Sequence, residues 1–156
     1  MLLTGCTPPG YVKRHERCIF PPLNLNPARV MWSYMHIRRG DVKQDRRFTA
    51  NEKYVQLLDI LAHHRPNAKI VIYSTGSPDQ FKSIKKDRAN VHFFLFPDLE
   101  MAFHAMVMAP LLITAKSAFS GTAAMLRIND YTHCPPPNNV AVTEACLSRL
   151  NWGLNP

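Results

Sequence analysis

The sequence predicts an α/β fold built on a doubly wound parallel sheet, and three observations favour this class. Short apolar runs rich in β-branched and aromatic residues alternate along the chain with segments of helical periodicity. These apolar runs are nearly continuous, as in strands that are buried on both faces. The 156 residues, 46 % hydrophobic and 19 % charged, suffice for one globular domain with a substantial core. Helices that alternate with parallel strands cover both faces of such a sheet.

Residues 1–28 are predicted to form an irregular arm, because they are rich in proline and show no periodicity. The sheet domain is predicted over residues 29–156. Its first strand is predicted at residues 29–37, "RVMWSYMHI", and a basic loop follows at residues 38–48.

The first helix is predicted over residues 49–65. Thr49 with Glu52 three positions later fits a capping box, and apolar residues then recur at helical spacing until Pro66. A second buried strand is predicted at residues 68–74.

The next part of the chain repeats this alternation. Ser77, Pro78 and Gln80 predict the start of a second helix. Asp98 is placed to cap a third helix, whose apolar stripe begins at Leu99. The remaining predicted elements are strands at 91–96 and 111–114, a helix within 115–127, a proline loop at 135–137 and a short helix near 143–150.

Three polar segments follow predicted strands, and ligands of doubly wound sheets bind at the carboxyl ends of the strands. The segments are "HIRRGD" at 36–41, "STGS" at 74–77 and "TAKSAFSGT" at 114–122. Their convergence at one edge of the sheet predicts a binding site there.

The chemistry of the first segment suits an anionic ligand. Side chains of consecutive residues in extended backbone alternate sides, so Arg38 and Arg39 are expected to separate. One guanidinium could then bind phosphate oxygens while the other pairs with Asp41 or the scaffold. Gly40 allows a sharp turn and a close approach of backbone to ligand.

In the third segment, Ser117 and Ser120 precede or open a helix, and a helix N-terminus attracts anions. An arginine and a helix end could therefore hold one diphosphate. Taken alone, the serines would be ordinary helix caps, the arginine pair a solvated turn, and His36 a structural histidine in an apolar strand.

The net charge of +8 and pI near 9.6 favour an anionic partner: a nucleic acid, a membrane surface or a phosphorylated small molecule. The basic stretch 38–47 contains no aromatic residue, which disfavours nucleic acid. No apolar run is long enough for a membrane span. The seven histidines do not share ligand spacings with carboxylates, so no metal site is expected.

The four cysteines form no C-x-x-C pair. Buried or free thiols are expected at Cys6, Cys18, Cys134 and Cys146, and a disulfide in a secretory compartment is the alternative. The N-terminus has no convincing signal peptide. Localisation therefore stays open between the lumen of the Golgi or endoplasmic reticulum and the cytoplasm.

Two of these segments resemble motifs of one enzyme family. "HIRRGD" at 36–41 looks like the H-x-R-R-x-D motif of the fucosyltransferase superfamily, which includes α-1,2-, α-1,6- and protein O-fucosyltransferases. Residues 98–126 are similar to its third motif: an acidic residue, an apolar helix, a strand and an S-x-F-S turn that opens the last helix. The two motifs occur in the family's order, about 60 residues apart.

The resemblance implies the C-terminal, Rossmann-like half of a GT-B glycosyltransferase that uses GDP-fucose without a metal or another cofactor. Carried over by position, Arg38 would be catalytic: it would hold the β-phosphate and assist the departure of GDP. The residues implied to bind or support the donor are His36, Arg39, Gly40, Asp41, Asp98, Glu100, Ser117, Phe119 and Ser120.

The expected function is therefore transfer of fucose from GDP-fucose to a glycan or protein hydroxyl. Gly121 and Thr122 stand where many relatives have bulky aromatic residues, which implies a different acceptor side. The acceptor domain of a GT-B enzyme is not expected within the chain, which would be a fragment or a reduced protein. The alternative is a non-catalytic module that binds GDP or a nucleotide sugar.

Overall fold

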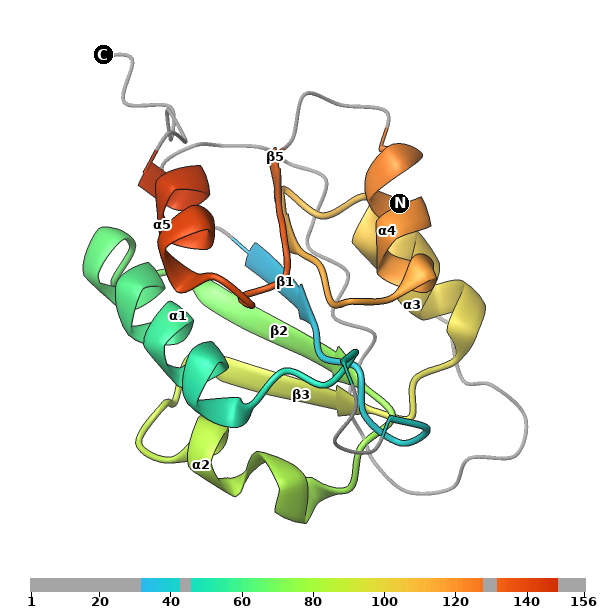
Figure 1. Cartoon of the computed structure of the whole chain (residues 1–156), viewed down its shortest axis with the longest axis horizontal. Coiled ribbons are helices and arrows are strands. Elements are labelled where there is room, and N and C mark those ends of the chain that lie inside the picture. The colour runs from blue at the N-terminus through green and yellow to red at the C-terminus, as the bar shows by residue number, and fades with distance from the viewer. Residues whose placement is uncertain (1–31, 43–45, 128–131, 149–156) are drawn as a thin grey trace, which may run out of the picture.

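The computed structural model describes residues 32–42, 46–127 and 132–148 (Figure 1). The predicted arm at 1–28 lies outside the described residues, as do positions 29–31 of the first predicted strand. No helix within these described segments is long and apolar enough to cross a membrane.

A five-stranded sheet, parallel throughout, forms the centre of the fold, in the order β3-β2-β1-β4-β5. The doubly wound α/β class predicted from the sequence is confirmed. The strands are β1 (Trp32–His36), β2 (Lys69–Ser74), β3 (Val91–Leu95), β4 (Leu111–Ile113) and β5 (Thr132–Cys134). In register, Tyr34 of β1 pairs with Val71 of β2 and with Leu112 of β4, so β1 lies between them.

Helices cover both faces of the sheet, with α1, α2 and α5 on one side and α3 and α4 on the other (Figure 1). Their bounds are α1 (Asn51–His64), η1 (Pro78–Phe81), α2 (Lys82–Lys85), α3 (Leu99–Val107), α4 (Ala118–Met125) and α5 (Val140–Ser148). η1 is a turn of 3₁₀ helix, and the second predicted helix therefore consists of η1 followed by α2.

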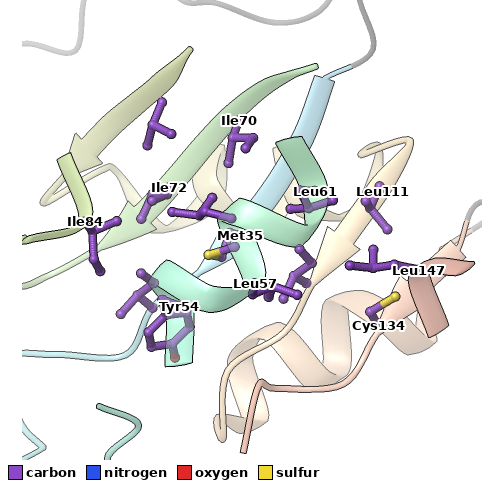
Figure 2. Packing of buried hydrophobic residues seen from close by; sticks show 14 of the residues in the cluster. Met35, Tyr54, Leu57, Leu61, Ile70, Ile72, Ile84, Leu111, Cys134 and Leu147 are labelled. Atoms are coloured by element: carbon purple, nitrogen blue, oxygen red, sulfur yellow. The ribbon is translucent and has the colours of Figure 1, made fainter. Parts of the chain in front are cut away.

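The strand side chains divide between two buried clusters, because successive residues point to opposite faces. Met35, Ile70 and Ile72 face α1 and α5, as Figure 2 shows from close by. Tyr34 and Val71 face α3 and α4. This explains why the strand sequences are nearly continuously apolar.

The last strand was not predicted. β5 has only three residues, Thr-His-Cys, and pairs with β4 alone, so its sequence carries no apolar run that would mark a strand. The helix predicted near 143–150 begins earlier, at Val140, in α5.

The predicted capping box at Thr49 and Glu52 is wrong. The helix begins at Asn51 with Ala50 as its N-cap, and no side chain caps it. Thr49 is buried, and its hydroxyl donates instead to Asn138 Oδ1 at 2.9 Å. The predicted caps at the other two helices are confirmed: Gln80 Oε1 accepts from Ser77 N, and Asp98 Oδ1 accepts from Met101 N.

The expectation of free thiols is wrong for two of the four cysteines. Cys134 at the end of β5 and Cys146 on α5 form a disulfide, with Cα atoms 5.8 Å apart. Cys134 is fully buried, so the bridge fixes α5 against the edge of the sheet. Cys6 and Cys18 lie outside the described residues.

Candidate functional site

The strand order reverses between β1 and β4, and the carboxyl end of such a switch point is where doubly wound sheets bind ligands. β1 leads there into the residues that we call the arginine loop, residues 37–42. β4 leads there into the start of α4. The rings of His36 and Phe119 contact each other edge to face, with centroids 5.8 Å apart. The two motif segments, far apart in the sequence, therefore meet in the structure.

Arg38 lies at the surface of this site. Its Nη2 donates to Asp41 Oδ2 at 2.6 Å and its Nε to Asp41 Oδ1 at 3.3 Å. The side chain of Arg38 is 24 % exposed and that of Asp41 is 61 % exposed. The hydrogen bond from Arg38 lowers the pKa of the Asp41 carboxyl. An ion pair this exposed contributes little to stability and can rearrange around a more highly charged ligand.

Arg39 points the other way, into the protein, where it is 2 % exposed. Its Nη1 donates to the Arg38 carbonyl at 2.9 Å, and its Nη2 donates to the Thr49 carbonyl at 2.8 Å and to Asn51 Oδ1 at 2.7 Å. The guanidinium also lies 4.4 Å from the ring centroid of Phe48. Burial lowers the pKa of Arg39. Arg39 thus supports the loop from inside, and Arg38 is the arginine that reaches the surface of the site.

Gly40 has a φ of +82°, a conformation that favours glycine. A Cβ at this position would also lie 2.8 Å from Thr75 Oγ1, which donates to the Arg39 carbonyl at 3.0 Å. The loop after β2 therefore packs directly against the arginine loop. Gly76 continues this contact, since a Cβ there would lie 2.7 Å from Arg39 Cβ.

His36 occupies the last position of β1 in largely apolar surroundings. Burial first, and the charge of Arg38 second, lower its pKa to about 4. Its Nδ1 is buried and has no hydrogen-bond partner within the segments that the structure describes. The side chain is therefore neutral at neutral pH and packs against Phe119 as an aromatic ring.

The start of α4 supplies the second half of the site. Ser117 is the N-cap of α4, and its side chain makes no capping hydrogen bond. Ser120 is fully buried, and its Oγ accepts from Ala115 N at 3.1 Å, so it shapes the turn from inside. Phe119 is half-buried between His36 and Phe103.

Asp98 and Glu100 lie apart from these residues. Both are exposed and stand at the start of α3, which follows β3 at the edge of the sheet. β2 separates β3 from β1, so the strand ends are about 10 Å apart at the usual strand spacing. The structure therefore brings together the arginine loop and the start of α4, and places the acidic pair two strands away.

Sequence reasoning missed several residues at this edge. Lys116 directly precedes Ser117, the N-cap of α4, and donates to the Arg46 carbonyl at 2.7 Å, which places a cation at the start of α4. Its position directly before Ser117, after a strand, was a usable signal. Asn51 and Asn138 gave no such signal, because their partners are distant in sequence.

A separate cavity lies at the amino end of β2 and β3, between α1 and α2. Leu58, Ile70, Ser83, Arg88 and Val91 are among its lining residues. It lies at the edge of the sheet opposite the arginine loop and the start of α4. Among the described residues, no group of three or more histidines, cysteines or carboxylates could hold a metal ion.

Neither the protein-family models nor the curated proteins contain a match to this sequence.

Proposed function

We propose that this chain binds the donor GDP-fucose as one half of a metal-independent glycosyltransferase that resembles fucosyltransferases. The observation that carries the proposal is the meeting of the two motif segments at the switch point of the sheet, marked by the contact of His36 with Phe119. The fucose would be transferred to a hydroxyl of a glycan or a protein, and the domain that binds this acceptor would lie outside this fold.

The proposed roles follow from position and burial. Arg38 binds the β-phosphate, Ser117 and the first N–H groups of α4 bind the diphosphate, and Lys116 adds positive charge. His36 and Phe119 form an apolar wall beside the donor. Arg39, Gly40, Asp41 and Ser120 hold the two segments in shape.

The chemistry requires charge stabilisation at the leaving group. Transfer breaks the bond between the fucose anomeric carbon and the β-phosphate oxygen, so negative charge develops on GDP while the sugar gains oxocarbenium character. Arg38, Lys116 and the N-terminus of α4 would stabilise that charge electrostatically. The new bond forms from the acceptor oxygen to the anomeric carbon, and a base must take the hydroxyl proton.

A non-catalytic module that binds GDP or a nucleotide sugar is the second candidate, and one observation favours it. Asp41 is the one carboxylate within the arginine loop, residues 37–42. It is paired with Arg38, so it is not placed to act as the base that fucosyl transfer requires. Both candidates share the donor site and differ in turnover.

The decisive experiment is calorimetric titration of the chain with GDP, GDP-fucose, UDP and ADP. We expect selective binding of the two guanosine ligands. Arg38→Ala should raise the Kd for GDP by roughly 10- to 100-fold, the loss of a hydrogen bond to a charged group. Lys85→Ala removes an exposed charge from α2 and is the matched control, with little expected effect.

Unchanged GDP affinity in a folded Arg38→Ala variant would contradict the phosphate-binding role. A second assay distinguishes an enzyme from a binding module: only an enzyme would hydrolyse GDP-fucose or transfer fucose to an added acceptor. Chelation with EDTA should change neither binding nor turnover, and loss of activity on chelation would contradict a metal-independent mechanism.

A further inference from the structure

Thr49, whose carbonyl accepts from Arg39, is contacted by a segment that lies about 90 residues further along the chain. Thr49 Oγ1 donates to Asn138 Oδ1 at 2.9 Å, and Thr49 is only 4 % exposed. Lys53 Nζ, on the first turn of α1, donates to the Asn138 carbonyl. Asn138 thus contacts Thr49, just before α1, through its side chain, and Lys53, on α1, through its main-chain carbonyl.

Thr49 passes this support on to the two arginines. Its carbonyl accepts from Arg39 Nη2 at 2.8 Å, and Arg39 Nη1 donates to the Arg38 carbonyl at 2.9 Å. Arg39 is buried, so a displaced Thr49 carbonyl would leave a guanidinium group without one of its acceptors. An unmet buried donor is costly, and the loop would shift to satisfy it.

Asn138 lies within the segment that the disulfide closes. Cys134 and Cys146, 12 positions apart, close a ring of chain that contains Asn138. The three residues after Cys134 are prolines, which stiffen this ring further. Reducing the disulfide opens the ring and increases the number of conformations that Asn138 can adopt.

We infer that Asn138 is a positioning residue for the arginine loop, and that the Cys134–Cys146 disulfide makes its hold sensitive to reduction. A dithiol reductant would supply two electrons and two protons, break the S–S bond, leave two thiols and become a disulfide itself. The loop would then lose order around Arg38 while the sheet stays folded. The consequence for GDP binding rests on the proposed function; the ordering of the loop does not.

Hydrogen exchange in the ligand-free protein tests the ordering directly. The amide of Ile37 is bonded to the Tyr73 carbonyl and that of Asp41 to the Arg39 carbonyl. In Asn138→Ala, we expect these amides to exchange roughly three to ten times faster, as for loss of one buried hydrogen bond. Amides inside β2, such as that of Ile72, should keep their rates, so the change is local.

Asn139→Ala is the matched control. Asn139 is the exposed neighbour of Asn138, and Thr143 bonds to its main-chain carbonyl, which the alanine variant retains. In Asn139→Ala, the amides of Ile37 and Asp41 should exchange at the wild-type rates. Reduction of the wild type by dithiothreitol should reproduce the pattern of Asn138→Ala. Unchanged rates at Ile37 and Asp41 in a folded Asn138→Ala variant would overturn the positioning role.

The proposed sensitivity to reduction is tested separately. It would be overturned if the amides of Ile37 and Asp41 exchanged faster in Asn138→Ala but not in the reduced wild type. It would also be overturned if reduction unfolded the whole protein, since a switch must leave the fold intact. GDP titration of the same samples should show a similar three- to tenfold loss of affinity. If no form binds GDP while the exchange pattern holds, the positioning role stands and the proposed function fails.

Discussion

Single residues set the shape of the arginine loop, and Gly40 is the clearest case. It combines a φ of +82° with an approach to Thr75 that leaves no space for a Cβ. Gly40→Ala should therefore lower the free energy of unfolding by about 1–3 kcal/mol, as measured by urea denaturation. Gly121, in α4, has nothing within 4 Å of the position of a Cβ.

Gly121→Ala is accordingly the control for that experiment. Alanine in a helix interior is favoured over glycine by about 0.5–1 kcal/mol, so this variant should be slightly stabilised. Equal effects of the two substitutions would contradict the strained geometry assigned to Gly40.

His36 predicts a specific dependence of stability on pH. Its pKa is about 4 in the folded chain against an ordinary value of 6.5, so the unfolded chain binds the proton more readily. The contribution of neutral His36 to stability is complete above pH 6.5. It is lost as the pH falls from 6.5 towards 4, by up to about 3 kcal/mol.

The check is to compare the free energies of unfolding of the wild type and His36→Leu at pH 7 and pH 4.5. The leucine variant lacks the titrating group. The free energy of unfolding should therefore fall more in the wild type than in His36→Leu between pH 7 and pH 4.5. Parallel pH profiles would show that His36 titrates alike in the folded and unfolded chain.

At the scale of the elements, Asp98 at the start of α3 has two roles to distinguish: capping the helix and binding the proposed nucleotide. Asp98 caps α3 through Met101 N at 3.1 Å, and it is also a residue that the family resemblance places near the nucleotide. Asp98→Ala should cost about 1 kcal/mol of stability, and Asp98→Asn much less, because asparagine also caps helices.

GDP affinity then reports the second role. If Asp98 binds the nucleotide through its charge, both variants should bind GDP more weakly, although only Asp98→Ala is destabilised. Wild-type GDP affinity in both variants would limit Asp98 to capping α3.

Most elements could be predicted from the sequence, and the exceptions have physical causes. β1, β2 and β4 are largely buried on both faces, and β3 is partly buried between the same helices, so their apolar runs mark all four directly. β5 is three residues at an edge and carries no such mark. Thr49 fits a capping box locally, but a tertiary hydrogen bond to Asn138 takes its hydroxyl.

The site shows the same division. Strand-end convergence could be predicted, because parallel strands align their carboxyl ends at one edge. The alternation of side chains in extended backbone also predicted that Arg38 and Arg39 would separate. Which of them is buried depends on Thr49, Asn51 and Phe48 around Arg39, and local sequence does not reveal that environment.

For the whole molecule, the net charge of +8 leaves a basic surface that a small anionic ligand and a nucleic acid would use differently. The proposed ligand GDP would make few ionic contacts, so its Kd should change less than about tenfold between 50 and 200 mM salt. A nucleic acid with 6–10 phosphate contacts would lose about 10³- to 10⁵-fold in affinity over the same range. Titrations with GDP and with a single-stranded oligonucleotide distinguish these outcomes.

The position of β1 in the middle of the sheet has a consequence for how the chain is assembled during synthesis. β2, which pairs with β1, follows it after a single helix, but the other neighbour of β1, β4, is synthesised only after η1, α2, β3 and α3. The arginine loop can therefore stand beside β2 while its partner at α4 is still unmade. A nascent chain stalled before residue 118 would lack α4 and with it half of the proposed site, so the proposed ligand could bind only late in translation.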